Sequence, residues 1–162
     1  MPENSPKILV GFDGSANSIE ALAWAVDEAS TWGWAVEALS VLQVPALAYG
    51  APGYMPPTLE RYRDEMAQVV EEALASTGRA GAGCPPVTLR VADGTAPSSI
   101  SERAGDDDVM MVVVGARGHG VITELMLGSA SHALSHTCPK PLVIVPHGWS
   151  RSRGERRPPA GL

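Results

Sequence analysis

The residues of this 162-residue chain that are best suited to bind a ligand lie in one glycine-rich stretch, Val109 to Ala130. The stretch begins with six apolar residues, Val109 to Val114, which have the length and β-branched content of a strand buried on both faces. A turn and the start of a helix follow, with Gly115, Gly118, Gly120 and Gly128-Ser129. A glycine loop lets a ligand approach the backbone, and its amides, those of the helix N-terminus and the Ser129 hydroxyl favour an anion.

The same residues also fit a plain structural turn. The stretch contains no GxxxxGK[ST] phosphate loop, and it lacks the third glycine of a GxGxxG dinucleotide motif. Tight glycine turns after strands are common in proteins. From these residues alone, a strand-to-helix turn and a phosphate site therefore both remain open.

Three features together resemble the universal stress protein (UspA) family, in its ATP-binding branch. The spacing Gly115-x2-Gly118-x9-Gly128-Ser129 occurs together with GFDGS at residues 11–15 and with Cys138-Pro139 before a final apolar run. The resemblance covers about Pro6 to Pro146. It implies an adenine nucleotide site for ATP with Mg²⁺, and a role as a nucleotide-dependent stress-response regulator or sensor.

The resemblance also implies a role for each site residue. Gly11 and Asp13 are expected near the nucleoside, where Asp13 accepts from ribose hydroxyls or helps to hold Mg²⁺, with a helix cap as the alternative. The backbone of Val41 is expected to meet adenine, and Arg117 either contributes charge or faces solvent. The residues expected around the ribose and phosphates are Gly115, Ala116, Arg117, Gly118, His119, Gly120, Val121, Gly128, Ser129 and Ala130.

Enzymatic activity has little support in the sequence. A hydrolase needs a base or a water-positioning group near the phosphates, and His119 is the one candidate in the glycine loop. His132 and His136 share a helix face without an HExxH zinc motif, and no GxSxG motif occurs. We expect slow ATP hydrolysis at most, with no catalytic and no metal-ligating side chain assigned.

The elements that must position these residues follow from hydrophobic periodicity and turn residues. Strands are expected at Lys7–Phe12, Ala35–Val44, Val87–Val91, Val109–Val114 and Pro141–Val145, and helices at 15–33, 58–77, 97–105 and 128–137. Their alternation predicts an α/β fold, a single Rossmann-like doubly wound domain with four helices and a five-stranded parallel sheet of order 3-2-1-4-5. That order brings the ends of the first and fourth strands, at Asp13 and Gly115, to one crevice.

The distribution of charged residues gives further expectations for the rest of the chain. Asp106, Asp107 and Asp108 precede the fourth strand, so they are expected at the sheet end opposite to the glycine loop, solvated rather than binding a metal. Residues 1–146 are expected to form the domain, followed by a basic, disordered tail at 147–162.

The net charge of -6 argues against nucleic-acid binding.

The composition suggests where the protein is located, and the fifth strand suggests that it pairs with a second copy. The sequence has no apolar run of membrane-spanning length and no signal-peptide pattern, so we expect a cytoplasmic protein. The fifth strand, Leu142 to Val145, resembles the family's dimer edge, which implies a homodimer. Two alternatives remain: a nucleotide-independent homodimeric interaction protein with a vestigial loop, and a protein that binds cAMP in the same crevice.

Overall fold

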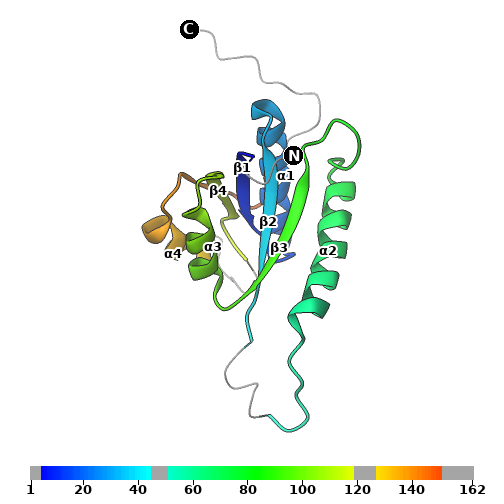
Figure 1. The fold of residues 1–162 in the computed structure, drawn as a ribbon, viewed down its shortest axis with the longest axis vertical. Coiled ribbons are helices and arrows are strands. Elements are labelled where there is room, and N and C mark those ends of the chain that lie inside the picture. The colour runs from blue at the N-terminus through cyan, green and yellow to red at the C-terminus, as the bar shows by residue number, and fades with distance from the viewer. Residues whose placement is uncertain (1–4, 45–50, 119–126, 151–162) are drawn as a thin grey trace.

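The computed structural model describes residues 5–44, 51–118 and 127–150. Within these ranges strands and helices alternate along the chain (Figure 1). The elements are β1 (Lys7–Gly11), α1 (Ala16–Trp32), β2 (Ala35–Leu42), α2 (Leu59–Ser76), β3 (Val87–Asp93), α3 (Ala96–Ala104), β4 (Val109–Gly115), α4 (Ser129–Thr137) and β5 (Leu142–Val145). Each predicted strand and helix is present, although β2 ends at Leu42 and β3 continues to Asp93.

The strands form one five-stranded sheet in the order β3-β2-β1-β4-β5, and all four neighbouring pairs are parallel. This confirms the predicted order and fold class. The chain builds outward from β1 in one direction, to β2 and β3, and then in the other, to β4 and β5. The strand order therefore reverses between β1 and β4, where an open parallel sheet leaves a crevice.

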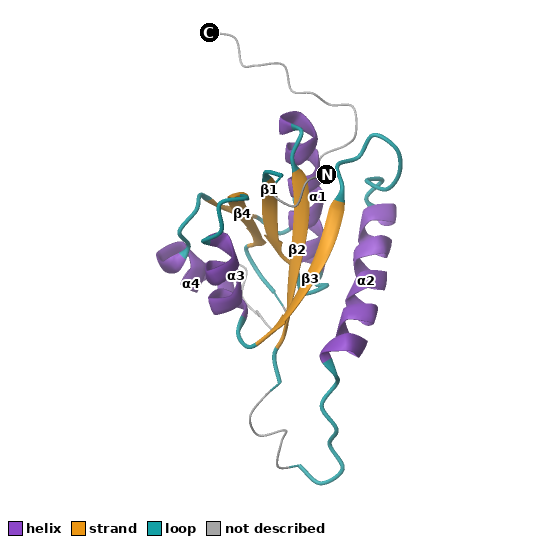
Figure 2. Ribbon diagram, viewed as in Figure 1, coloured by secondary structure: helices purple, strands orange, loops and turns teal. Residues whose placement is uncertain are grey.

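Helices cover both faces of the sheet (Figure 2). One core cluster joins α1 and α2 to side chains such as Ile8 and Val10, and the other joins α3 and α4 to side chains such as Leu9 and Val112. The assignment alternates along β1 because successive side chains of a strand point to opposite faces. Val112, Val113 and Val114 of β4 are thus buried on both sides of the sheet, as the composition predicts, whereas Met110 near the start of the strand is exposed.

The helix ends follow the turn residues of the sequence. Ser15 is the N-cap of α1 and accepts a hydrogen bond from the Ser18 N–H, and Gly33 ends the helix in the left-handed region with φ of 70°. Thr58 caps α2 in the same way through the Arg61 N–H. These caps fix where α1 and α2 begin relative to the strands that precede them.

The chain remains in contact with the domain after β5. The Gly148 N–H donates to Glu20 on α1, and Trp149 packs against the core cluster of α1 and α2. Packed structure therefore continues past the predicted domain boundary at residue 146, through the first residues of the expected tail. Residues 151–162 of that tail lie outside the described residues.

A cluster of ion pairs fixes α3 to the end of the sheet where the strands begin. Arg103 Nε donates to Glu37 Oε1 at 2.7 Å, and Arg103 Nη1 donates to Asp108 Oδ1 at 2.7 Å. Lys7 Nζ lies 2.9 Å from Asp108 Oδ2, and the Arg103 side chain is only 7% exposed. Hydrogen bonds from Arg103, and then from Lys7, hold the pKa of Asp108 well below its usual range.

The expectation that all three aspartates are solvated is wrong for Asp108. Its side chain is 10% exposed and lies between Arg103 and Lys7, whereas Asp106 is largely exposed and still bonds to Arg103 at 2.9 Å. The sequence did not reveal this because Lys7 lies on β1, far along the chain, and because the approach of Arg103, only five residues away, depends on how α3 packs against the sheet. Asp107 is exposed, as expected.

We expect Arg103→Met to lower the free energy of unfolding by about 3–5 kcal/mol, because it leaves the buried Glu37 and Asp108 carboxylates without their main partner. Urea unfolding followed by circular dichroism measures the change. Arg61→Met is the control, since Arg61 pairs with Glu65 on an exposed helix surface, and it should change stability by less than about 0.5 kcal/mol. Equal effects of the two variants would contradict the structural role of the cluster.

The lowered pKa of Asp108 also predicts how stability depends on pH. The group titrates near pH ~4 in the unfolded chain and lower in the folded chain, so its contribution is complete above about pH 4 and lost as pH falls through the folded-state pKa. Between about pH 5 and pH 2, the unfolding free energy of the wild type should therefore fall more steeply than that of Asp108→Asn. Parallel pH profiles from urea unfolding would rule this out.

Candidate ligand cavity at the reversal of strand order

A cavity of about 420 Å³ opens at the carboxyl ends of β1, β2 and β4. Most of the predicted site residues line it: Gly11, Asp13, Val41, Gly115, Arg117, Gly118, Gly128, Ser129 and Ala130. They come from segments about a hundred residues apart, which the reversal of strand order brings together. His119, Gly120 and Val121 lie outside the described residues.

Ala116 does not line the cavity, although it belongs to the predicted set. Its N–H donates to the Val145 carbonyl at 2.8 Å, and its carbonyl accepts from the Gly128 N–H at 2.7 Å. The Ser131 hydroxyl also lies 3.0 Å from the same carbonyl. Both backbone groups of Ala116 therefore hold the loop against β5 and the start of α4.

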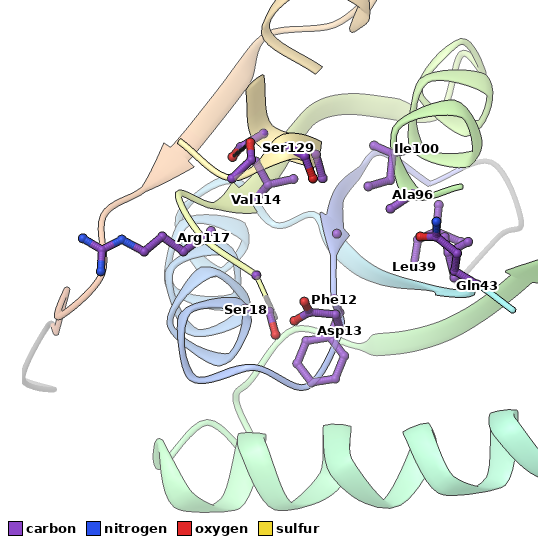
Figure 3. A pocket seen from close by; sticks show the side chains of 17 residues that line it. Phe12, Asp13, Ser18, Leu39, Gln43, Ala96, Ile100, Val114, Arg117 and Ser129 are labelled. Atoms are coloured by element: carbon purple, nitrogen blue, oxygen red, sulfur yellow. Dashed lines mark hydrogen bonds between the residues drawn. The ribbon is translucent and has the colours of Figure 1, made fainter. Parts of the chain in front are cut away.

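The cavity has an apolar side and a polar side. Figure 3 shows Leu39, Ala96 and Ile100 together with Gln43 on one side, away from Asp13 and Ser18. Gly118, Ser129 and Ala130 line the cavity as well, and they belong to the glycine loop and the start of α4. The lining residues that sequence reasoning missed are Phe12, Ser18, Leu39, Gln43, Ala96, Ile100, Val114 and Ser131.

Asp13 turns the chain from β1 into α1 and faces the glycine loop. Its Oδ1 accepts from the Ser15 N–H at 2.9 Å, while the N-cap position itself belongs to Ser15. A Cβ atom on Gly118 would lie 2.8 Å from Asp13 Oδ2. With the Asp13 carboxylate in this position, a side chain at 118 would displace either the carboxylate or the loop, so the two motifs are in direct contact.

The amino terminus of α4 forms the far wall of the polar side. Gly128 is the N-cap with extended backbone, and Ser129 is the first of nine helical residues. The first amides of a helix have no partner within it, and they carry the positive end of its dipole. Both Ser129 and Ala130 line the cavity, so this side favours an anion.

The backbone of Val41 points into the crevice. The Leu39 carbonyl accepts from the Phe12 N–H at 2.9 Å, so it is directed toward β1. Because strand geometry repeats every two residues, the carbonyl of Val41 is directed the same way, beyond the end of β1. The Tyr62 hydroxyl of α2 lies 3.4 Å from this carbonyl and 2.8 Å from Ser40 Oγ, which fixes the end of β2.

The side chain of Arg117 is directed away from the cavity, as Figure 3 shows, while its backbone belongs to the lining loop. Its N–H donates to Oδ1 of Asn17 at 2.9 Å. Asn17 was not predicted from the sequence, where it is one polar residue in the first turn of a helix. Its importance comes from contacts with β4 and β5 that only the fold creates.

Other chemistry is sparse in the part of the chain that the structure describes. The rings of His132 and His136 lie 5.2 Å apart and both residues are exposed on α4. Within residues 5–44, 51–118 and 127–150, no group of three or more His, Cys, Asp or Glu side chains is placed to hold a metal ion. Among the same residues, no helix is long and apolar enough to cross a membrane.

Comparison with known proteins agrees with this architecture. A universal stress protein from Mycolicibacterium smegmatis is 32% identical over 159 residues, which is 96% of this chain and 52% of the relative. A relative from Mycobacterium bovis is 32% identical over 150 residues, 89% of this chain and 46% of the relative. This chain thus spans about half the length of these mycobacterial relatives.

Solved structures share the fold at low sequence identity. A universal stress protein in complex with cAMP has a TM-score of 0.63 and 20% identity, and the match covers 88% of this chain and 98% of that one. The universal stress protein from Archaeoglobus fulgidus in complex with dAMP has a TM-score of 0.59 and 16% identity, with coverages of 87% and 97%.

The family assignment follows from a match over most of the chain. The model of the universal stress protein family matches residues 5–146, which include the turn after β1, the glycine loop after β4 and the start of α4. These are the segments that meet at the cavity. The chain therefore belongs to the universal stress protein family.

Proposed function

We propose that this protein binds an adenine nucleotide, ATP with Mg²⁺, and acts as a nucleotide-dependent regulator or sensor in a stress response. One observation carries the proposal. A single cavity joins an apolar side, lined by Leu39 and Ile100, to a polar side made by Asp13, the Gly118 backbone and the first residues of α4. A nucleotide has the same division, with a flat base at one end and phosphates at the other.

The residues present fit each part of that ligand. The base lies between the side chains of β2 and α3, where the outward-directed backbone of Val41 supplies a donor and an acceptor to its edge. The amides of Ser129 and Ala130 and the Ser129 hydroxyl bind the phosphates. The Gly118 backbone lies close to Asp13, so the polar side brings a carboxylate and backbone groups of the glycine loop together.

Asp13 is the residue that would hold Mg²⁺, which supplies positive charge between phosphate oxygens when it is bound. Among the described lining residues, Asp13 is the one carboxylate, and its Oδ1 already accepts from the Ser15 N–H. We therefore infer a binding protein with slow ATP hydrolysis at most. Regulation arises when the bound nucleotide orders the glycine loop in a form that a partner recognises.

Two further parts of the proposal have their own support. β5 is a four-residue strand at the edge of the sheet, so pairing between two copies would continue the sheet. We therefore propose a cytoplasmic homodimer of the 1–146 domain.

cAMP is the second candidate ligand, because a protein of the same fold has been solved in complex with it. It would use the same cavity.

Calorimetric titration of nucleotide-stripped protein with ATP and Mg²⁺ tests the function. We expect saturable binding near one ATP per chain, weaker binding of GTP, and displacement of cAMP by ATP, because one base-binding side serves both adenine ligands. Tight cAMP binding without ATP binding would favour the cAMP alternative. No heat with either ligand from folded protein at millimolar concentration would leave the nucleotide-independent homodimer as the better interpretation.

Gly118→Val should abolish ATP binding without unfolding the protein. The new Cβ would lie 2.8 Å from Asp13 Oδ2, so either the Asp13 carboxylate or the loop must move and the polar side of the cavity changes shape, whereas Gly118 itself is exposed and contributes little to the core. Calorimetry measures the affinity, and circular dichroism with thermal melting measures the fold. Ala51→Val, at an exposed position outside the lining, is the control. Unchanged ATP affinity in Gly118→Val would count against the proposed site.

A further inference from the structure

The amide side chain of Asn17 joins three segments that meet beside the cavity. Its Oδ1 accepts from the Arg117 N–H at 2.9 Å, and its Nδ2 donates to the Val145 carbonyl at 3.2 Å. The partners fix the orientation of the amide, because a backbone N–H requires the oxygen and a carbonyl requires the nitrogen. Asn17 is only 3% exposed, so water does not replace these bonds.

The glycine loop also packs directly on this side chain. A Cβ atom on Gly115 would lie 2.9 Å from Oδ1, Cγ and the backbone oxygen of Asn17. The end of β4 therefore rests against Asn17. The Ala116 N–H then donates to the Val145 carbonyl, and the Arg117 N–H donates to Asn17. Asn17 thus contacts the loop on both sides of Ala116, before the loop reaches Gly118 and the polar side of the cavity.

Glu20 extends the same network to the chain after β5. Its Oε2 accepts from Asn17 Nδ2 at 2.8 Å, and its Oε1 accepts from the Gly148 N–H at 2.9 Å. His147 Nδ1 lies 3.6 Å from Oε2, and Trp149 packs against the core. One carboxylate thus connects the residue that holds the loop to the segment that follows the edge strand.

We propose that Asn17 is a positioning residue for the glycine loop, and that Glu20 links the loop to residues 146–149 after β5. The part that concerns phosphate binding rests on the proposed function, while the part that concerns the loop rests on the hydrogen bonds alone. Asn17 does not line the cavity, so it acts through the Arg117 backbone. The loop then responds to changes in the segment next to the sheet edge.

Hydrogen exchange of the Arg117 amide, followed by NMR in nucleotide-free, full-length protein, tests the positioning directly. Asn17→Ala removes the acceptor, so exchange at Arg117 should become about tenfold faster relative to a core amide such as Val112, which corrects for any loss of global stability. Glu28→Ala on α1 is the control, since the Glu28 carboxylate accepts a hydrogen bond from Trp32 Nε1 on the exposed surface of the same helix. Unchanged relative exchange at Arg117 would overturn the proposal.

Swapping the amide and the carboxylate between positions 17 and 20 tests the proposed link between Asn17 and Glu20. Asn17→Asp places a second carboxylate beside Glu20 and beside the Val145 carbonyl, so it should also raise the relative exchange of the Arg117 amide about tenfold. Adding Glu20→Gln to the same chain restores a donor between the two positions and leaves their total charge as in the wild type. The combined variant should return to within about threefold of wild type, and no recovery would overturn the link through Glu20.

A comparison of the affinities for ATP and adenosine provides a readout that a general loss of stability would not reproduce. Because the loop lies on the polar side, Asn17→Ala should raise the Kd for ATP about tenfold but change the Kd for adenosine less than about twofold. Equal losses for both ligands would overturn a role in phosphate positioning. If the wild type bound neither ligand, the proposed function would fail, and hydrogen exchange at Arg117 would still decide the role of Asn17 in the loop.

Discussion

The reversal of strand order between β1 and β4 is the constraint on which the site depends. The two strands pair from Lys7 to Val10 and from Val109 to Val113, with a register shift between Lys7 and Ile8. Beyond their carboxyl ends the chain departs to opposite faces, into α1 after β1 and toward α4 after β4. Backbone groups at this point have no further strand to pair with, so they are satisfied by turns, by side chains such as Asn17, or by a ligand. The glycine loop and the Asp13 turn both provide partners for backbone groups at this point.

The ion-pair cluster and the cavity lie at opposite ends of the parallel strands. Where the strands begin, Arg103 and Lys7 neutralise Glu37 and Asp108 in a largely buried cluster. Where β1, β2 and β4 end, the cavity is lined by the backbone of the glycine loop, by Asp13 and by apolar side chains such as Leu39. Helix α3 takes part in both, because Ala96 and Ile100 line the cavity and Arg103 belongs to the cluster.

Much of this arrangement could be predicted from the sequence, and the reasons for the rest are physical. Strand positions and helix ends follow from local patterns, such as the apolar run of β4 and the caps at Ser15 and Thr58, and the strand order follows from the Rossmann-like fold that their alternation indicates. The glycine and aspartate positions expected at the cavity follow from the resemblance of the motifs to the universal stress protein family. Ile100, Ala96 and Leu39 could not be identified, because an apolar side chain that lines a cavity looks the same in sequence as one in the core. Asn17, Arg103 and Asp108 each have a partner more than 60 residues away, and the bond between Arg103 and Asp108 depends on how α3 packs.

The position of Arg103 on α3 has a consequence for the shape of the cavity. Three residues and about one helical turn separate Ile100 from Arg103, so the helix is held by ion pairs near its carboxyl end and borders the cavity through Ala96 and Ile100. Ile100 and Ala104 also pack in the core. The width of the apolar side of the cavity is therefore set by ion pairs and core packing on the opposite side from the opening of the glycine loop, rather than by residues of the loop itself.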